Sequence, residues 1–542
     1  MTEPHISIIG CGFSGIAMGI KLKMAGHNNF TIFDKSAGVG GTWFENTYPD
    51  CGCDIPSGLY SFSFENYPDW DRVWSKQPQI LKYQQHCVNK YGLMPHIKLN
   101  SMMRACDWDE KSATWTLQIE DVGKHGDADA DEGRGGSVYK VTSTYVVMAQ
   151  GTLHVPQFPN VSGVNVQNGE SCFKGDSFHS AEWNHSVDLS GKRVGVIGSG
   201  ASAIQLVPEV AKVAKELHVF QRTAPYVQYK TDFALPGFVK YIFRYVPFAM
   251  TVFRYSLYIA TEIRFPALFS NSWMSKWIKW DNIRYLKQVV KDPKMQEKLI
   301  PPYELGCKRM LFSSFWYPAL IKPNVHVVQD RIVGVSEEGI VVDPKTTGTT
   351  GSQEAQSSSS AASSTKVIDL DVIVYSTGFQ YTRVNAPRKH QFDVTGQRGT
   401  SLTKWFQEGP KCMLGITAPD FPNLFFVYGP NSNLGHNSII FMIECQVNYI
   451  MKLLAMAKKN PSWKYVQVLK ECVDDYYETH VRKALIGKVW DSCTSWYRWP
   501  VKDPSTGAVT LTGNVYSLWP SSTLWYYWMT LWPVKSHFRD SF

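Results

Sequence analysis

The chain contains 542 residues, of which 44% are hydrophobic, and 55 basic against 47 acidic side chains give a formal net charge of +8. This length predicts about three or four domains of ordinary size, with enough apolar side chains for packed cores. The basic residues are scattered among the acidic ones without a basic run or a nucleic-acid motif, so nucleic acid is not an expected partner.

The pattern of the eleven cysteines indicates the redox state of the cellular compartment. Their number is odd, and they form neither a secretory disulfide framework nor a C-x-x-C pair. We therefore expect a reduced chain in the cytoplasm. Residues Met1 to His5 lead directly into an expected strand, so we expect no signal peptide.

A glycine-rich turn follows the first expected strand, His5 to Ile9. Its glycines, which allow a tight turn, close approach of a pyrophosphate and close helix packing, are Gly10, Gly12 and Gly15. The helix that begins here offers N–H donors and a positive dipole end to phosphate. A second strand, Phe30 to Phe33, ends on Asp34, where a carboxylate accepts hydrogen bonds from a ribose 2′-hydroxyl. An unphosphorylated ribose fits FAD; the alternative is a surface Asp that closes the strand.

A second turn of the same kind follows a strand that begins at Val194. It contains Gly198, Gly200, Ala201 and Ser202. The next strand, Leu217 to Phe220, leads to Arg222 and Thr223, with no acid where NAD specificity requires one. Because a guanidinium presents forked donors to a phosphoryl group, Arg222 favours a 2′-phosphate and therefore NADPH. The alternative is a solvated surface arginine.

The segment between the two turns carries a longer motif. It reads Phe173-Lys-Gly175-Asp-Ser-Phe-His179-Ser-Ala-Glu-Trp183. The motif resembles the fingerprint of type I Baeyer–Villiger monooxygenases, which are class B flavoprotein monooxygenases, and the resemblance covers nearly the whole chain. Here the fingerprint is followed by Asn184, whereas the family has Pro or Asp, and sister enzymes that oxidise nitrogen or sulfur end the motif differently.

The turns and the resemblance together predict an α/β fold with two Rossmann-like dinucleotide-binding domains, one for FAD and one for NADP, and an inserted helical subdomain. We expect the first part of the FAD-binding domain at residues 1–155 and the first part of the NADP-binding domain at 156–225. A helical insertion then spans 226–300 and the second part of the NADP-binding domain 301–380. The second part of the FAD-binding domain, with a C-terminal wrap, spans 381–542.

A stretch that the family carries around the flavin runs here from Gly40 to Asp54. It differs from the family at Asp50, where Gly or Met is usual. By resemblance Trp43 and Asp54 lie near the isoalloxazine, and Asp54 pairs with a catalytic arginine; the alternative is a turn carboxylate that caps the following loop. The further cofactor-binding residues that the resemblance implies are Lys35, Thr42, Tyr60, Thr377, Gly378 and Trp490.

The resemblance also implies roles for three residues outside the glycine turns. Lys308 and Arg309 form an adjacent pair, which the family places between the cofactors. Lys308 then holds the NADPH phosphate, and Arg309 faces the flavin peroxide. His179 belongs to the catalytic set as the residue that organises the linker between the nucleotide domains, rather than as a proton carrier.

Three further segments suggest other roles. An EF-hand loop that began at Asp127 would need a Glu where Val138 stands, so no metal is expected. The segment Thr346 to Lys366 is of low complexity and predicts a disordered surface insert. The uncharged run Pro504 to Val534 is long enough for a tail anchor, but Pro520 and the dense Trp and Tyr favour a wrap over the core. Contact of this run with a membrane interface is therefore possible but not expected.

We predict an FAD-, NADPH- and O2-dependent Baeyer–Villiger monooxygenase that converts a small-molecule ketone to an ester or lactone through a flavin peroxide. Two alternatives remain open: oxygenation of nitrogen or sulfur with the same two sites, and a non-catalytic nucleotide sensor. The sequence identifies neither the ketone nor the oligomeric state.

Overall fold

The computed structural model describes residues 3–123, 136–347, 365–380, 392–407, 409–491, 493, 495, 497–499, 501–502, 509–510 and 513–538. The acidic segment around Asp127 and most of the low-complexity segment Thr346 to Lys366 lie outside these residues. Within them, no group of His, Cys, Asp and Glu side chains is arranged to hold a metal ion.

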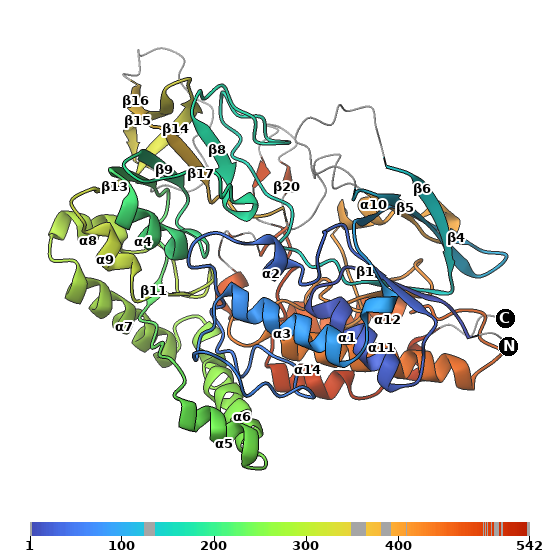
Figure 1. Cartoon of the computed structure of the whole chain (residues 1–542). Helices are drawn as coiled ribbons and strands as arrows, with labels where there is room; N and C mark the ends of the chain where they lie inside the picture. The colour runs from blue at the N-terminus through green and yellow to red at the C-terminus, as the bar shows by residue number, and fades with distance from the viewer. Residues whose placement is uncertain are drawn as a thin grey trace.

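The first parallel sheet has five strands in the order β19-β7-β1-β2-β3 (Figure 1). They are β1 (Ile6–Ile9), β2 (Phe30–Phe33), β3 (Ile97–Lys98), β7 (Tyr145–Met148) and β19 (Leu424–Phe426). Side chains alternate between the two faces of the central strand. Ile6 and Ile8 pack in one apolar cluster with the helices, whereas Ile9 packs in another with an antiparallel sheet. Both faces are therefore buried, which is why these strands are short and apolar.

The layers over the first sheet are helices on one face and antiparallel strands on the other. The helices are α1 (Phe13–Met24), α3 (Gln77–Lys90) and α11 (Ile439–Lys459). The antiparallel layer has the order β18-β4-β5-β6 and consists of β4 (Ser101–Asp109), β5 (Thr114–Asp121), β6 (Val138–Ser143) and β18 (Asp393–Thr395), the last of which pairs parallel with β4.

The second parallel sheet repeats this plan, in the order β13-β10-β9-β17-β8. Its strands are β8 (Asp176–His179), β9 (Arg193–Ile197), β10 (Glu216–Phe220), β13 (Val325–Val328) and β17 (Val372–Tyr375). Helices α4 (Ala203–Val213) and α9 (Trp316–Leu320) pack against it, and β14 (Asp330–Val335), β15 (Gly339–Thr347) and β16 (Lys366–Asp369) form the antiparallel layer. The predicted α/β fold with two Rossmann-like domains is confirmed.

One backbone contact recurs at both glycine turns. Gly10 has a φ of +109°, and a Cβ there would lie 2.5 Å from the carbonyl oxygen of Ala149, just after β7. Gly198 has a φ of +120°, and a Cβ there would lie 2.3 Å from the carbonyl oxygen of Ser376, just after β17. The returning chain thus touches the first glycine of each turn, and a side chain there would clash.

A group of helices lies between two short parallel-paired strands, β11 (Val227–Gln228) and β12 (Leu311–Phe312). Helices α5 (Gly237–Tyr245) and α6 (Ala249–Glu262) form a hairpin that projects at the lower edge of Figure 1. Helices α7 (Trp273–Val289) and α8 (Pro293–Leu299) lie beside the second sheet. This group is helical, as the sequence predicts.

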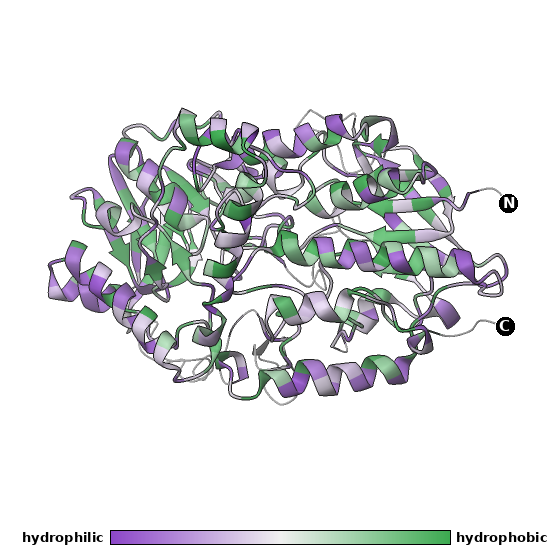
Figure 2. Cartoon of the chain, turned by 90° about the horizontal axis from the view of Figure 1, so that it is seen from below, coloured by the Kyte–Doolittle hydropathy of each residue, from purple (hydrophilic) through white to green (hydrophobic). Residues whose placement is uncertain are grey.

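The C-terminal part of the chain returns to the first sheet, where α14 (Thr523–Thr530) packs on α11. Among the described residues α11 is the helix long and apolar enough to cross a membrane, but 56% of its most apolar window is buried. It also packs on α1 and is therefore a core helix. Figure 2 shows the strands of both sheets mostly in the hydrophobic colour, whereas the helices alternate between the two colours.

The remaining elements are short. They are α2 (Thr42–Glu45), η1 (Met94–His96), η2 (Ser180–Glu182), η3 (Phe265–Leu268), η5 (Gln397–Gly399), α10 (Leu402–Gln407), α12 (Lys470–Tyr476), the π-helical turn η6 (Tyr477–Arg482), α13 (Lys483–Leu485), η7 (Val489–Asp491), β20 (Val501–Lys502), β21 (Val509–Thr510) and η8 (Lys535–His537).

Candidate active site

A cavity of about 320 Å³ opens at the first glycine turn and extends to the second. Its walls combine residues that are far apart in the sequence. The sequence-predicted site residues that line it are Gly10, Gly12, Asp34, Lys35, Thr42, Trp43, Asp54, Tyr60, Ala201, Ser202 and Arg309. The fold therefore brings both glycine turns, the flavin loop and Arg309 to one space.

The first glycine turn has room for a pyrophosphate. A Cβ on Gly15 would lie 1.9 Å from the carbonyl oxygen of Gly10, so this glycine is required by helix packing and lies behind the turn. A Cβ on Gly12 would have no atom closer than 3.7 Å, so the space beside this glycine is open. An open second glycine at a helix N-terminus is the place where a dinucleotide phosphate binds.

Asp34 lies at the end of β2 and is 7% exposed. Its carboxylate accepts hydrogen bonds from the backbone N–H groups of Cys11, at 2.5 Å, and Ser36, at 2.8 Å. A carboxylate has about four acceptor positions, so two remain for the hydroxyls of a ribose. The neighbouring Lys35 pairs with Glu45 at 3.0 Å. These residues fit the adenosine ribose of FAD.

Arg309 and Asp54 form an ion pair in the wall of the cavity. The guanidinium Nη2 donates to Oδ1 of Asp54 at 2.6 Å. The Arg309 side chain is 42% exposed, and because it lines the cavity, this exposed surface faces the cofactor space. The charge of Asp54 raises the pKa of Arg309 further above its already high value. The arginine is therefore a fixed, permanently charged cation.

Aromatic residues surround this ion pair. Burial raises the pKa of Tyr428 to about 12, although the charge of Arg309 acts in the opposite direction, so the phenol stays neutral near Arg309. The indole N–H of Trp43 donates to the hydroxyl of Tyr60 at 3.3 Å, with the rings edge to face. These rings give the cavity an apolar lining next to the Arg309–Asp54 ion pair, and such surroundings strengthen electrostatic interactions.

Asp50, the position at which the flavin loop differs from the family, has a φ of +62°. This left-handed conformation favours Gly, and Asp is among the residues that tolerate it best. The carboxylate of Asp50 also pairs with Lys76 at 2.8 Å. The loop thus keeps a turn that suits a glycine while using an Asp.

Gln205 is a contact that sequence reasoning missed. It lies on α4, and its side-chain amide donates to the carbonyl oxygen of Gly52 and accepts from the N–H of Gly52, both at 3.0 Å, while Tyr48 donates to it at 3.2 Å. It therefore ties the flavin loop to the second glycine turn. In the sequence, the only indication of this contact is that Gln205 is a polar residue among the apolar positions of its helix.

The second glycine turn is also open, since no atom lies within 4 Å of a Cβ built on Gly200. Arg222 follows β10, and its charge adds to burial in lowering the pKa of Lys308, so the two cations lie close to one another. Among the described residues no carboxylate forms an ion pair with either. Thr223 lies beside them, where its carbonyl oxygen accepts from the Ser199 hydroxyl at 3.1 Å. Two adjacent uncompensated cations fit a phosphate dianion.

His179 lies at the end of β8, between the two segments that connect the domains. The side chain is 1% exposed, its Nδ1 accepts from the N–H of Ala181 at 3.1 Å, and its ring touches those of Phe158 and Phe379. Burial lowers the pKa of His179 to about 4, against a backbone hydrogen bond with Gly378. The imidazole is therefore neutral near pH 7.

The two segments that connect the domains, residues 155–157 and 377–380, pair with each other. The N–H of Gln157 donates to the carbonyl oxygen of Gly378 at 2.9 Å, and the hydroxyl of Thr377 donates to the carbonyl oxygen of Gln157. The N–H of Gln380 donates to Val155 at 2.9 Å. Thr377 and Gly378 thus lie in a double linker and not in the cavity wall, and His179 packs against that linker.

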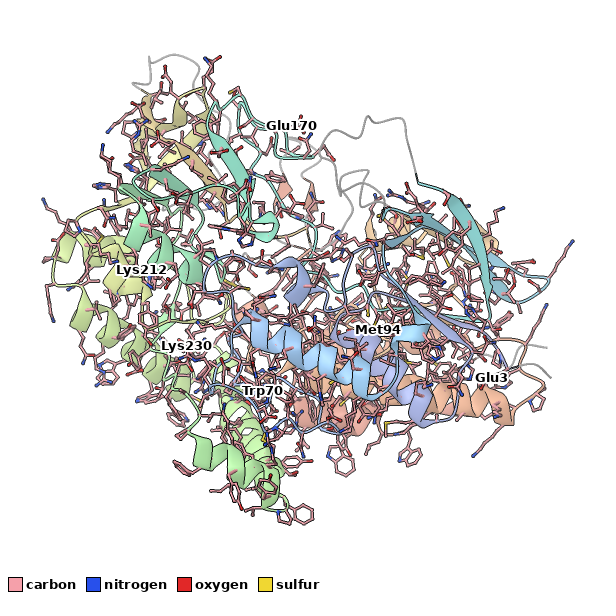
Figure 3. The ribbon with its side chains drawn as sticks, in the orientation of Figure 1. Glu3, Trp70, Met94, Glu170, Lys212 and Lys230 are labelled. Carbon is pink, nitrogen blue, oxygen red and sulfur yellow. A yellow bond between two sulfur atoms is a disulfide. The ribbon has the colours of Figure 1, made fainter. Side chains whose placement is uncertain are left out.

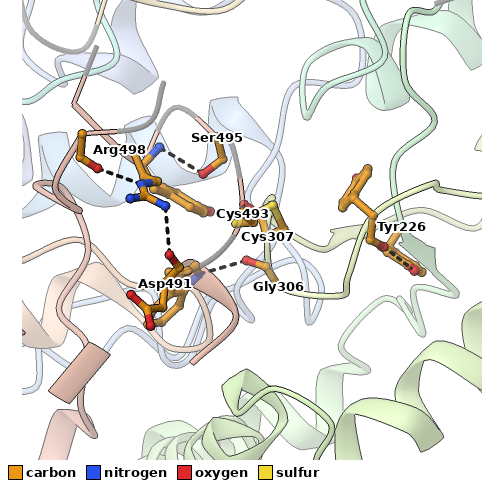
Figure 4. The surroundings of a disulfide bond; sticks show 11 residues. Tyr226, Gly306, Cys307, Asp491, Cys493, Ser495 and Arg498 are labelled. Atoms are coloured by element: carbon orange, nitrogen blue, oxygen red, sulfur yellow. Dashed lines mark hydrogen bonds between the residues drawn. A yellow bond between two sulfur atoms is a disulfide. The ribbon is translucent and has the colours of Figure 1, made fainter. Parts of the chain in front are cut away.

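Trp490, a predicted cofactor contact, is not among the residues that line the cavity. It is 1% exposed, and its indole N–H donates to the carbonyl oxygen of Gly306 at 2.9 Å. Next to it, Cys307 and Cys493 form a disulfide, with their Cα atoms 5.7 Å apart (Figure 4). The expectation of a fully reduced chain is therefore wrong. The two cysteines are 186 residues apart in the sequence, and only the folding of the C-terminal segment onto the Lys308 loop brings them together.

Two glycine turns that open onto one cavity, with a fixed cation in its wall, are the arrangement expected of a flavin- and nicotinamide-dependent oxidoreductase. The family model for flavin-binding monooxygenase-like proteins matches residues 3–250. A Baeyer–Villiger monooxygenase of Pseudomonas aeruginosa is 36% identical over 92% of this chain and 85% of its own length. A second one, from Streptomyces coelicolor, is 34% identical over 91% and 86%. The solved structure of an oxidized steroid monooxygenase bound to NADP matches with a TM-score of 0.75 and 25% identity, over 98% of this chain and 97% of that one.

The chain belongs to the Baeyer–Villiger monooxygenases, which use FAD, NADPH and O2 to convert ketones to esters or lactones. The predicted family, cofactors and reaction are confirmed, and a non-catalytic nucleotide sensor is excluded. The partner is a small molecule.

Proposed function

We propose that Arg309 is the residue of this chain that stabilises the negative charge formed on oxygen while the ketone is oxidised. The observation that carries the proposal is the Arg309 guanidinium, which lines the cavity and is held by Asp54 at 2.6 Å. When bound, FAD and NADPH supply the electrons and the activation of O2. Insertion of oxygen next to a carbonyl places negative charge on oxygen, and a guanidinium that stays protonated at any working pH stabilises that charge.

Asp54 is the positioning residue for Arg309. One of the five guanidinium N–H groups binds Asp54, which leaves others to face the cavity. A cation held in place needs no reorganisation when the negative charge develops. The neutral Tyr428 beside it adds no competing charge. Asp54 thus acts through Arg309 and not on the substrate.

The remaining predicted residues bind and couple the cofactors. Gly12 and Asp34 hold the pyrophosphate and ribose of FAD, supported by the open space and the free acceptor positions described above. Arg222 and Lys308 hold the 2′-phosphate of NADPH, supported by their mutual proximity. His179 stays neutral and fixes the double linker between the domains.

The test is NADPH consumption by the purified protein with linear, cyclic and aryl ketones and one thioether, followed by identification of products. Ester or lactone from at least one ketone with the wild type, and little or none with Arg309→Ala, supports the proposal. Formation of sulfoxide without ester from any ketone would favour heteroatom oxygenation instead.

We place the enzyme in the cytoplasm. Nine of its cysteines carry no disulfide, and seven of these are buried, which suits a reducing compartment. Fractionation of cells that express the full chain tests the location.

A further inference from the structure

An unusually apolar surface covers the α5–α6 hairpin and α14. No residue of α5 is buried. Phe248, at the tip between α5 and α6, is 77% exposed. We call this surface the aromatic face; its exposed residues are Phe238, Tyr241, Tyr245, Phe248, Val252, Tyr255, Ile259, Leu524, Trp525, Trp528 and Trp532. Single exposed apolar side chains are ordinary, but a group of this size marks an interaction surface.

The two parts of the aromatic face are continuous. The hydroxyls of Tyr258 on α6 and Thr523 on α14 are 2.9 Å apart. The ring of Phe441 packs beside those of Tyr258 and Tyr527, with ring centres 5.1 and 6.2 Å apart. In Figures 1 and 3 the hairpin and α14 lie along the same lower edge, and their side chains project from it.

The charges on this face are of one sign. Residues 233–261 contain no acid and contribute Lys240 and Arg244, since their third cation, Arg254, is buried, and residues 513–538 contain Lys535 and no acid. Lys452 of α11 lies 4.7 Å from the ring centre of Trp532. Arg244 pairs with Asp69 at the rim. Aromatic side chains interleaved with Lys and Arg are the composition that enters the interface of an anionic membrane.

The hairpin is fixed to the body of the enzyme. The guanidinium of Arg254 is buried and donates to the carbonyl oxygens of Gly58, Leu59 and Ser61, at 3.2, 3.4 and 2.8 Å. At the end of α6, Glu262 accepts from the N–H of Thr523 at 2.8 Å. The exposed aromatic side chains are therefore held outward and cannot collapse onto the core.

We propose that the aromatic face docks the enzyme on a bilayer that contains anionic phospholipid. Helices α5 and α6 have 9 and 14 residues, fewer than the ~20 that a membrane span needs, so the hairpin lies in the interface. A second copy of the chain fits less well, since two faces with the same positive charge repel each other. The sequence leaves membrane contact possible but not expected, and the exposure of these side chains in the folded chain favours it.

The test is co-sedimentation of the FAD-loaded enzyme with vesicles of phosphatidylcholine, either pure or mixed equally with phosphatidylglycerol. The enzyme binds the mixed vesicles and is released by salt. Phe248→Ser and Trp528→Ser each lower the binding constant roughly tenfold or more, the loss expected for one buried large side chain. Lys240→Gln lowers it roughly fivefold on mixed vesicles only.

Phe315→Ser is the matched control, because Phe315 is 64% exposed but precedes α9 beside the second sheet. It leaves vesicle binding unchanged. Retained yellow FAD and an unchanged melting temperature show that the variants fold. Failure of the folded enzyme to bind mixed vesicles at low salt overturns the proposal. So does a concentration-dependent dimer that Phe248→Ser and Trp528→Ser convert to monomers, since a second copy then covers the face.

Discussion

Replacement of Arg309 by Ala separates the two halves of the catalytic cycle. Hydride transfer from NADPH to FAD places no negative charge on an oxygen of the substrate, so Arg309→Ala should still bleach the flavin. The oxygen-insertion step does need the cation. Loss of one preorganised donor in a closed site costs about 10²–10³ in rate, or about 2.7–4 kcal/mol. Arg309 lies in such a site, with its partner Asp54 at 2.6 Å.

The magnitude depends on how firmly the cation is held. Arg309→Lys keeps a charge but loses the rigid fork that reaches Asp54, so it should retain more product formation than Arg309→Ala. Asp54→Ala leaves the guanidinium in the cavity without its partner and should slow the same step less than Arg309→Ala does. If Arg309→Ala forms the least product and both Arg309→Lys and Asp54→Ala form more, the charge of Arg309 promotes oxygen insertion and the ion pair with Asp54 positions it.

The assay has two parts. Anaerobic rapid mixing with NADPH follows flavin reduction, and aerobic turnover with a ketone follows ester formation, NADPH loss and hydrogen peroxide. For Arg309→Ala we expect near-normal reduction, little or no ester, and electrons lost to peroxide wherever oxygen still reacts. Ester formation at the wild-type rate would refute the argument and remove Arg309 from the mechanism.

Four further predictions address the other parts of the molecule. Arg222→Ala should raise the KM for NADPH roughly tenfold or more, because a lost charge-assisted phosphate contact costs about 1.5–3 kcal/mol; steady-state kinetics with NADH, which lacks the phosphate, should be unchanged. His179→Ala should keep FAD but lower the ester formed per NADPH, and full coupling would show that the linker does not need it. The pKa of Glu262 is about 2: burial acts to raise it, but the hydrogen bonds from His436, Thr523 and Asn437 and the charge of His436 together lower it more. This depressed pKa stabilises the fold above pH 4.5 and its effect is lost as the pH falls towards 2, so Glu262→Gln should cost about 3 kcal/mol in urea unfolding at pH 7 and progressively less below pH 4.5. Cys307→Ser should lower the free energy of unfolding by about 2–4 kcal/mol in the absence of reductant. A wild-type melting temperature that dithiothreitol leaves unchanged would contradict this.

The glycine turns and the residues after their strands could be recognised from the sequence because they depend on local backbone geometry. Gly10 and Gly198 take positive φ values within a few residues of their strands. Asp34 and Arg222 follow the second strand of each unit, and strand, turn and helix together place such residues at the ligand. Local order along the chain was sufficient for both cofactor assignments.

The contacts between distant segments could not be derived this way. Gln205 meets the flavin loop 153 residues earlier, and Arg309 meets Asp54 across 255 residues. Spacing along the chain carries no information about such pairs, and the Arg309–Asp54 pair was expected only because the family resemblance implied it. The Cys307–Cys493 disulfide was missed for the same reason, since neither cysteine lies in a recognisable motif.

The two nucleotide sites and the α/β class could be predicted from the sequence, because they follow from glycines, strand ends and charges that act over a few residues. The chemistry was predicted only through the resemblance of the Phe173–Trp183 motif to a known family. Only the tertiary structure decided which side chains share the cavity, that Trp490 is buried, and that Phe248 and Trp528 face outward. Burial and pairing depend on how distant segments pack. Apolar residues on a helix give the same sequence pattern whether they face a core or a membrane.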